Sequence, residues 1–247
     1  MRSAENPVLQ PGVALVSGPV AVAAAVPEPA SQPLSSSGPA ARIDRAALAH
    51  NFAQVRRIVG SRTDVLAMVK SDAYGHGGPL VARALAAAGC RSFGVATVAE
   101  AAEVGGALRV APAGPVRVVV FGGLLPEEAV AVLEAGAEAV TQEIEVVRAL
   151  GAAAAAAGTE ARVHLKLDTG MHRLGIAPTD AVEFAREASR VAGVRLVAAC
   201  SHFAQAESVT GNVTAGQLEA MLGATAALHD AGFELERHLA NSAGILT

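Results

Sequence analysis

Aromatic residues are nearly absent from this sequence. Phe, Trp and Tyr together make up 3% of the 247 residues, Trp does not occur, and Tyr74 is the single tyrosine. Ala and Val must therefore fill the interior of a chain that is 52% hydrophobic. A chain of this length can form one large core, and α/β barrels commonly reach this size as a single domain.

Charged residues are also sparse, and their distribution argues against a nucleic-acid partner. Charged residues make up 17% of the chain, the net charge is -4, and acids and bases are mixed along the sequence. Because no basic patch is interleaved with aromatic residues, we expect no nucleic-acid partner.

Cysteines and long apolar runs are scarce as well. Cys90 and Cys200 stand alone within apolar segments and lack metal-ligand spacing. We therefore expect buried free thiols, a cytoplasmic protein and no metal site. No apolar stretch of about eighteen residues, the length of a membrane span, is free of helix breakers, so no membrane association is expected.

The first 40 residues differ in composition from the rest. Residues 8–26 are apolar but interrupted by prolines and glycines, and the acidic Glu5 precedes them, which departs from the pattern of a signal peptide. Residues 27–39 are rich in Pro, Ser, Gln and Ala and carry almost no charge. We therefore expect a disordered tail over residues 1–40 and an ordered domain over residues 41–247.

Beyond the tail, short apolar runs alternate with helical patterns. Asp44 is a suitable N-cap for the first helix, and Gly60 is a suitable end. Further helices are predicted over residues 80–88, 143–157, 180–191 and 216–231. One more helix is predicted to end at about 105, and another to begin at Pro126. Strands are predicted over residues 65–69, 92–97, 116–121, 139–141, 162–167 and 195–200, with a last segment at 238–242.

This alternation indicates parallel βαβ units. Seven strand-then-loop units are present, each but the last followed by a helix. A closed barrel of this type needs eight. The predicted fold is therefore α/β, a (β/α)8-type TIM barrel that is incomplete at its C-terminus. The unpaired edges of its first and last strands are expected to favour aggregation or rearrangement.

The stretch VLAMVKSDAYGHG, residues 65–77, joins an apolar run to a polar loop rich in glycine. Lys70 stands at the junction, at the end of the predicted strand. Partial desolvation there favours the neutral amine, which is the form that attacks carbonyl groups in Schiff-base lysines. A lysine at a strand end more often extends into solvent, so the interpretation depends on the flanking residues.

Residues 69–77, VKSDAYGHG, closely resemble the cofactor-lysine motif of alanine racemases. These isomerases carry pyridoxal 5'-phosphate in a (β/α)8 barrel and interconvert L-alanine and D-alanine, which supplies D-alanine for the peptidoglycan of the cell wall. The resemblance implies that Lys70 binds the cofactor covalently and that Tyr74 binds its phosphate. The nine-residue match contains rare residue types, so it is far more specific than a lone glycine pattern.

A second motif, LKLDTGMHRLG over residues 165–175, resembles another racemase signature. It implies that Arg173 hydrogen-bonds the phenolic oxygen of the cofactor, where a fixed positive charge favours the phenolate. Lys166, which is carbamylated in some members, would orient Arg173, with Asp168 and Met171 in supporting positions. Without the motif, Lys166 and Asp168 would be interpreted as an ordinary ion pair at a strand end.

Two further segments extend the resemblance. In the segment SHFA, His202 matches a histidine that lies against the cofactor ring. In HLANSAGIL, residues 238–246, Asn241 and Ser242 match cofactor-binding positions, with the serine on the phosphate. His238 matches a histidine that bonds an arginine on the next strand, and that arginine faces the pyridine nitrogen.

All of these motifs follow predicted strands. In a parallel barrel the reacting groups lie at the C-terminal ends of the strands, so their placement supports one shared site. No comparable role in the site is predicted for four other histidines, namely His50, His76, His164 and His229. We interpret His50 and His229 as helix-surface residues.

The resemblance also implies a mechanism, and this sequence departs from the family's pattern for it. In the family, the cofactor lysine exchanges the α-proton of the amino-acid substrate on one face, and a tyrosine from the partner subunit's C-terminal domain acts on the other. Here the single tyrosine, Tyr74, is already assigned to phosphate. The eighth strand, the pyridine-facing arginine and the C-terminal β domain are also missing. We therefore expect an N-terminal fragment, weakly active or inactive alone, of an enzyme that is a homodimer at full length.

Three alternatives remain. A single-barrel carrier binds pyridoxal phosphate without racemase activity, although such proteins lack the two long motifs. A racemase for serine or for a broad range of amino acids shares the barrel. A barrel that binds phosphate compounds without this cofactor belongs to a different class, and cofactor binding by a Lys70→Ala variant would distinguish it.

Overall fold

The computed structural model describes residues 41–110, 114–208 and 211–246. The tail expected over residues 1–40 lies outside these ranges.

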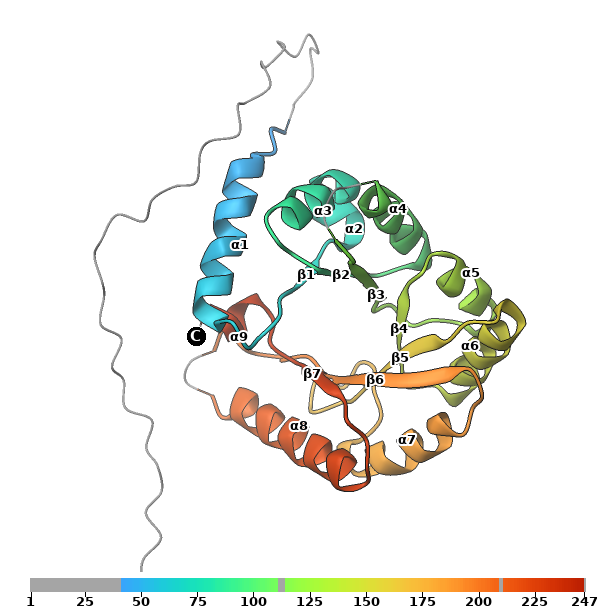
Figure 1. The fold of residues 1–247 in the computed structure, drawn as a ribbon. Coiled ribbons are helices and arrows are strands. Elements are labelled where there is room, and N and C mark those ends of the chain that lie inside the picture. The colour runs from blue at the N-terminus through green and yellow to red at the C-terminus, as the bar shows by residue number, and fades with distance from the viewer. Residues whose placement is uncertain (1–40, 111–113, 209–210, 247) are drawn as a thin grey trace, which may run out of the picture. The chain divides into compact units, whose positions relative to one another are not determined.

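Seven parallel strands in the described ranges form one sheet, in which each strand pairs with the next along the chain. The sheet curls around a common centre with helices outside it, so the incomplete barrel expected from the sequence is confirmed (Figure 1). The strands are β1 Leu66–Met68, β2 Ser92–Val95, β3 Arg117–Val120, β4 Glu138–Thr141, β5 Ala161–Lys166, β6 Val194–Cys200 and β7 Glu236–His238.

Helices connect the strands and cover the outside of the sheet (Figure 1). Single 3-10 turns, Pro126–Glu128 and Pro178–Asp180, lead into two of them. The helices are α1 Arg45–Val59, α2 Lys70–Gly75, α3 Gly78–Ala87, α4 Val98–Arg109, α5 Ala129–Glu134, α6 Ile144–Ala157, α7 Ala181–Ser189, α8 Val213–Asp230 and α9 Ser242–Leu246.

Local signals at the chain start predict α1 correctly. Oδ1 of Asp44 accepts hydrogen bonds from the backbone N–H groups of Ala46 at 2.8 Å and Ala47 at 3.1 Å. Gly60 adopts φ +75° and ends the helix. An N-cap carboxylate and a glycine in the left-handed region each satisfy backbone groups that a helix leaves unpaired.

The predicted end of one helix, at about 105, is wrong, because helix α4 continues past Gly105 to Arg109. A Cβ at Gly105 would lie 3.4 Å from the carbonyl oxygen of Ala135. Gly105 is therefore a site of close helix packing rather than a helix end. The last segment, predicted over 238–242, is also wrong: strand β7 spans Glu236–His238, and a short helix, α9, follows it where the sequence predicted none.

The layer between sheet and helices is made of small aliphatic residues. Val95, Val147, Leu150 and Ala154 are each 0% exposed. Burying one such Val or Leu side chain stabilises the fold by roughly 1.5–3 kcal/mol. Ala and Val therefore supply the core that the scarcity of aromatics requires.

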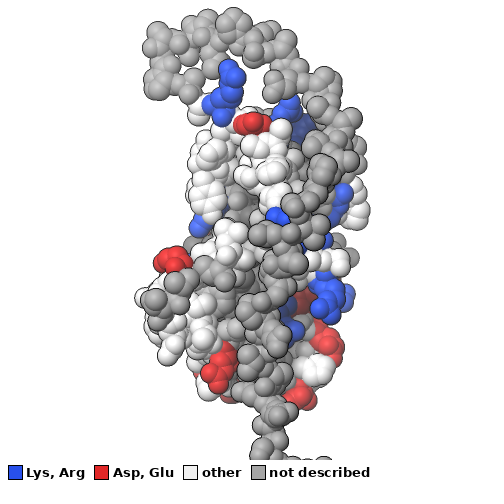
Figure 2. Space-filling model, turned by 90° about the vertical axis from the view of Figure 1, so that its left-hand side faces the viewer, with Lys and Arg blue, Asp and Glu red and all other residues white. Residues whose placement is uncertain are grey.

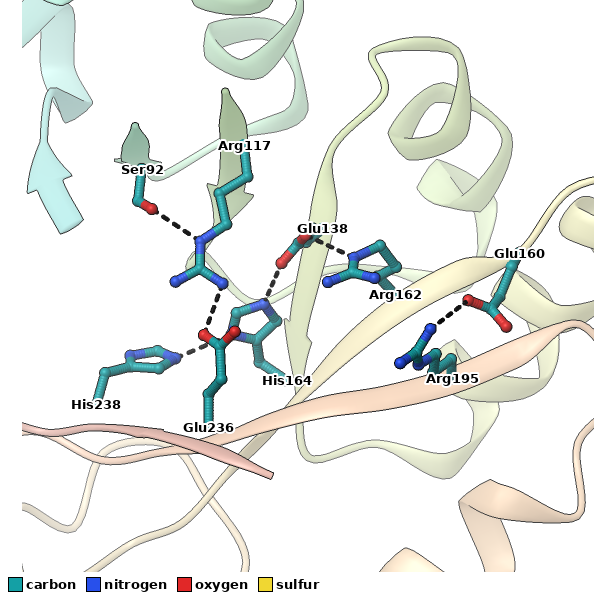
Figure 3. Close-up of polar contacts among 9 residues, drawn as sticks. All are labelled: Ser92, Arg117, Glu138, Glu160, Arg162, His164, Arg195, Glu236 and His238. Atoms are coloured by element: carbon teal, nitrogen blue, oxygen red, sulfur yellow. Dashed lines mark hydrogen bonds and ion pairs between the residues drawn. The ribbon is translucent and has the colours of Figure 1, made fainter. Parts of the chain in front are cut away.

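The inner face of the barrel is polar at its floor, where the strands begin. It carries side chains from β2, β3, β4, β5 and β7, namely Ser92, Arg117, Glu138, Arg162, His164 and Glu236, and His238 lies above them at the end of β7 (Figure 3). Barrels of this class usually fill this space with layers of branched aliphatic residues. The sequence did not predict this polar interior.

The surface carries charge of both signs. On the face shown in Figure 2, Lys or Arg and Asp or Glu side chains are scattered among uncharged residues. Among the described residues, every helix is too short or too polar to cross a lipid bilayer.

Candidate functional site

The polar motifs follow the C-terminal ends of four strands. Lys70 follows β1, the segment 168–173 follows β5, His202 follows β6, and Asn241 and Ser242 follow β7. Because all strands are parallel and adjacent along the sheet, these segments lie at the same end of the barrel. We call this end the mouth.

The Lys70 loop is an ordered left-handed turn rather than the irregular loop that its glycine content suggested. Ser71, Asp72, Ala73 and Tyr74 have φ values of +52°, +53°, +52° and +58°. The left-handed conformation costs roughly 1–2 kcal/mol for each residue with a Cβ. Backbone strain of this kind persists only where surrounding contacts impose it, and it is concentrated at functional sites.

Glu100, at the N-terminus of α4, supplies those contacts. Its carboxylate accepts hydrogen bonds from the backbone N–H groups of Ser71 at 2.7 Å, Ala96 at 2.7 Å and Thr97 at 3.3 Å. Within the turn, the N–H of Ala73 donates to the carbonyl oxygen of Val69 at 2.9 Å. Glu100 therefore fixes the backbone next to Lys70, a role that the sequence analysis missed.

Lys70 and Tyr74 lie near each other on this turn. Nζ of Lys70 is 6.0 Å from the centre of the Tyr74 ring. Lys70 is half-buried, while Tyr74 is 60% exposed. Val69, which is 1% exposed, anchors the turn in the core. The amine and the phenol are thus both available to a ligand at the mouth.

Asp168 shapes the loop that carries Arg173. Its Oδ1 accepts hydrogen bonds from the backbone N–H groups of Gly170, Met171 and His172 at 2.9–3.0 Å. Burial opposes the charge of Asp168, but hydrogen bonds from the backbone of His172 and Gly170 and from the side chain of His172 outweigh burial and hold its pKa below the ordinary value. The structure therefore gives Asp168 a role within its own loop, in addition to its attraction to Lys166.

Gly175 closes the same loop. Its φ is +128°, and a Cβ there would lie 2.5 Å from the backbone nitrogen of Asp168 and 2.6 Å from the carbonyl carbon of Leu167. Only glycine fits this approach. The conformation that places Arg173 at the surface of the mouth therefore depends on this residue.

Cationic side chains gather at the mouth. Burial, followed by the charge of Arg173, lowers the pKa of Lys166, whereas Cys200 and Asp168 oppose the shift. Burial, followed by the charges of Lys166, Arg173 and Lys70, lowers the pKa of His202. The charges of Lys166, Arg173 and Lys70 thus all act on His202, and the sharing of one ligand site by these residues stays a prediction. The cluster suits an anionic ligand.

A buried hydrogen-bond network ties the loops of the mouth together. Oγ1 of Thr169 and Oγ of Ser201 lie 2.8 Å apart. Gln217 of α8 is 2% exposed; it donates to the carbonyl oxygen of His202 at 3.0 Å and accepts from the N–H of Ala204 at 2.8 Å. The sequence analysis missed Thr169, Ser201 and Gln217. The first two lie on different loops that bond each other, and Gln217 comes from a helix later in the chain.

Asn241 and Ser242 lie at the start of α9. Oδ1 of Asn241 accepts a hydrogen bond from the N–H of Gly244 at 2.9 Å. A Cβ at Gly244 would lie 2.9 Å from the ring of Phe203, the residue after His202. This contact brings the start of α9 beside the loop that carries His202.

His238 is held from below by a residue that the sequence analysis set aside. Nε2 of His238 lies 2.9 Å from Nδ1 of His164, and Nε2 of His164 lies 2.7 Å from Oε2 of Glu138 (Figure 3). His164 is 0% exposed. The alternation Arg-x-His-x-Lys along β5 was an available signal, because it places Arg162, His164 and Lys166 on one strand face.

These buried groups have strongly shifted pKa values. Burial would raise the pKa of Glu138, but hydrogen bonds from His164 and Arg162 lower it to about 2. Burial, followed by the charges of His164, Arg117 and Lys166, lowers the pKa of His238 to about 3, against the opposing effect of Glu138. In the described residues, no group of three or more His, Cys, Asp or Glu side chains could hold a metal ion.

A cavity of about 290 Å³ lies elsewhere, between α8 and the segment that leads into β7. Its lining includes Leu222, Phe233, Leu235 and Arg237. Leu222, Phe233 and Leu235 precede β7 and Arg237 lies within it, so the lining comes before the C-terminal end of β7 and the cavity does not belong to the site described above.

Comparisons with known proteins agree with the motifs. A sequence model of the family described as "Alanine racemase, N-terminal domain" matches residues 43–247. An alanine racemase of Chlorobaculum tepidum is 37% identical over 201 residues, which cover 81% of this chain and 52% of that protein. The chain thus spans about half the length of the curated relatives it matches.

Solved structures show the same relationship. The alanine racemase of Streptomyces coelicolor A3(2) superposes with a TM-score of 0.75 at 34% identity, covering 83% of this chain and 54% of that chain. A histidine racemase of Leuconostoc mesenteroides superposes with a TM-score of 0.71 at 25% identity, covering 81% and 52%.

Proposed function

The chain belongs to the family of the alanine racemase N-terminal domain, and on this premise we propose that it forms the pyridoxal-phosphate-binding barrel of an enzyme that interconverts L-alanine and D-alanine. The observation that carries the proposal is the placement of Lys70 on a strained, clamped turn at a cationic mouth. The family motif around Lys70 implies that this lysine is the one that binds the cofactor.

The donor set fits pyridoxal 5'-phosphate. The group carries an aldehyde, a phenolic oxygen and a phosphate, which call for an amine, a cation and hydroxyl or amide donors. The mouth offers Lys70, Arg173, and the side chains of Tyr74, Asn241 and Ser242. When bound, the cofactor supplies an electron sink that acidifies the α-proton of an amino acid.

Each residue then has a defined task. Lys70 would hold the aldehyde carbon until the amine of the substrate replaces it, and the freed amine of Lys70 would then move the α-proton on one face of the substrate. Arg173 would hold the phenolic oxygen. The resemblance implies that a carbamate on Lys166, with its negative charge, would orient Arg173. His202, kept neutral by burial and by neighbouring cations, packs against the ring without adding positive charge.

Proton transfer on the other face needs a second base. The resemblance assigns the only tyrosine of the chain, Tyr74, to the phosphate. We therefore propose that the 247 residues alone racemise alanine slowly or not at all, and that a second copy or a further domain supplies the base. Two buried free thiols, Cys90 and Cys200, support a reducing compartment such as the cytoplasm.

One observation favours a second candidate within the same chemistry. Because a histidine racemase shares the fold, a racemase for another amino acid is the alternative. A panel of L-amino acids offered to the chain, alone and with a full-length racemase as positive control, separates the two by their relative rates. A non-catalytic carrier would bind the cofactor and racemise none of them.

The decisive experiment uses the fact that the chain has two lysines, Lys70 and Lys166. The purified chain is mixed with pyridoxal phosphate and reduced with borohydride, and the labelled peptide is mapped. We expect label on Lys70, its loss in Lys70→Ala, and its retention in the matched control Lys166→Ala. Label confined to Lys166 or to the N-terminal amine would overturn the assignment of the cofactor lysine.

A further inference from the structure

Gln217 is a buried polar side chain that helix α8 brings to two loops of the mouth. It is 2% exposed and lies in the second turn of α8. Burying an amide group without hydrogen bonds costs free energy, so its partners indicate what it holds in place. The two loops are the Arg173 loop, residues 168–175 after β5, and the His202 loop, residues 201–204 after β6.

The amide group of Gln217 bonds the backbone of the His202 loop. Its Nε2 donates to the carbonyl oxygen of His202 at 3.0 Å, and its Oε1 accepts from the N–H of Ala204 at 2.8 Å. A carbonyl oxygen can only accept and a backbone N–H can only donate, so these partners fix the orientation of the amide group. An apolar side chain of the same length would leave both backbone groups without this partner.

The same side chain contacts the Arg173 loop. A Cβ at Gly170 would lie 3.5 Å from Cγ of Gln217, which is an ordinary van der Waals distance. Nε2 of Gln217 also lies 3.5 Å from Oγ1 of Thr169, which is 48 positions earlier in the sequence and at the outer limit of a hydrogen bond. One residue of α8 therefore contacts both loops.

Two hydroxyl groups continue from this contact in a fixed direction. Oγ of Ser201 donates to the carbonyl oxygen of Leu167 at 2.8 Å, and this bond uses its single proton. Oγ1 of Thr169 must therefore donate to Oγ of Ser201, 2.8 Å away, and can accept from Gln217. None of these groups titrates, so the direction from Gln217 to Leu167 does not depend on pH.

The two loops carry residues of the proposed ligand site. Arg173 belongs to one loop and His202 to the other, and the charge of Arg173 acts on His202. Gln217 belongs to neither loop, yet it bonds the backbone of His202 itself. The spacing between the two ligand groups therefore depends on a helix that carries no ligand group of its own.

We propose that Gln217 is a positioning residue that couples the Arg173 loop to the His202 loop, so that α8 sets the placement of His202 relative to Arg173. The meaning of this placement for an anionic ligand rests on the proposed function. The coupling between the two loops does not, and it is measurable without any ligand.

The test follows backbone amides of the Arg173 loop by hydrogen exchange in the full chain. Gln217→Met keeps the length of the side chain and removes its hydrogen bonds. We expect exchange at Gly170 and Met171, which donate to Asp168, to become about tenfold faster than in the unmodified chain. The amide of Leu150 in α6 is the internal reference, because a general loss of stability would speed its exchange equally. Unchanged exchange in the Arg173 loop, relative to this reference, would overturn the proposal.

Two control variants on α8 separate coupling from other effects. Glu219→Met changes an exposed side chain two residues away. Thr214→Val removes a bond from Oγ1 to the carbonyl oxygen of Gln205 at 3.2 Å, so it loosens the segment after His202 without a printed bond to the Arg173 loop. We expect neither control to change exchange in the Arg173 loop. The NMR signal of the His202 ring should move in Gln217→Met and stay in Glu219→Met, and equal effects in the controls and in Gln217→Met would contradict the coupling.

A second pair of variants gives a readout if Gln217→Met fails to fold. Thr169→Val removes the hydroxyl group and Thr169→Ser keeps it. We expect faster exchange at the N–H of Ala204, in the other loop, for Thr169→Val and the rate of the unmodified chain for Thr169→Ser. The same exchange rate at Ala204 in both variants would count against the proposal.

The consequence for the ligand site is measured separately by titration with pyridoxal phosphate. We expect Gln217→Met to bind it about tenfold more weakly, with borohydride label still on Lys70, which lies on a separate turn after β1. Equal affinity despite faster exchange in both loops would overturn the role in the ligand site. Absence of label on Lys70 in the unmodified chain would refute the proposed function, while the exchange rates would still decide the coupling.

Discussion

The backbone N–H of Ser71 donates a hydrogen bond to Oε1 of Glu100 at 2.7 Å, across 29 positions of sequence. Ser71 is the first residue of the left-handed turn after Lys70, and Glu100 also completes the capping box of α4 with Thr97. One carboxylate therefore serves both a helix start and the strained turn. This arrangement makes the position of Lys70 depend on an intact α4 N-terminus.

Glu100→Ala tests this dependence. Loss of three backbone hydrogen bonds to a carboxylate should lower the free energy of unfolding by roughly 2–4 kcal/mol, measured by urea denaturation. Borohydride labelling of Lys70 should also fall at urea concentrations where the protein is folded. Glu103→Ala, an exposed glutamate on the same helix, is the matched control and should change both quantities little.

Gly175→Ala tests the close approach in the Arg173 loop. A Cβ at Gly175 meets the backbone of Leu167 and Asp168, and φ is +128°, so we expect a loss of about 2–4 kcal/mol in the free energy of unfolding. Gly123→Ala is the control, because no atom lies within 4 Å of a Cβ there. Equal thermal unfolding midpoints for the two variants would refute the steric argument.

The buried carboxylate of Glu138 predicts a specific acid sensitivity. Its pKa falls from 4.5 to about 2 on folding, so its contribution to stability is present above pH 4.5 and is lost as the pH falls through about 2. The unmodified chain should lose on the order of 2–3 kcal/mol more than Glu138→Gln across this window. Parallel acid dependence of unfolding in the two proteins would show that Glu138 titrates as it does in the unfolded chain.

The two thiols should be unreactive in the folded protein. Cys200 is 0% exposed, and burial raises its pKa to about 12 although Lys166 opposes the shift. Cys90 is 1% exposed, and burial raises its pKa as well. We expect iodoacetamide to modify both only in denaturant, as followed by mass spectrometry. Rapid alkylation of Cys200 in the folded protein would mean that the C-terminal end of β6 opens to solvent.

The alternation of apolar runs and helical patterns was enough to predict the parallel strands and the incomplete barrel. Asp44 and Gly60 predicted the bounds of α1, because caps act on backbone groups a few residues away. The motifs located Lys70, Arg173 and His202 at strand ends, and parallel pairing then brings such ends together. What they bind stays a prediction.

Tertiary structure decided the features that depend on distant residues. The left-handed turn after Lys70 requires Glu100, and a turn of four residues with Cβ atoms contradicts local preference. His164 gains its role from Glu138 and His238, 26 and 74 positions away. Glu138 and His164 lie on paired strands, but β6 separates the strands of His164 and His238. The curl of the sheet therefore brings the two histidines together, and local sequence does not report that curl.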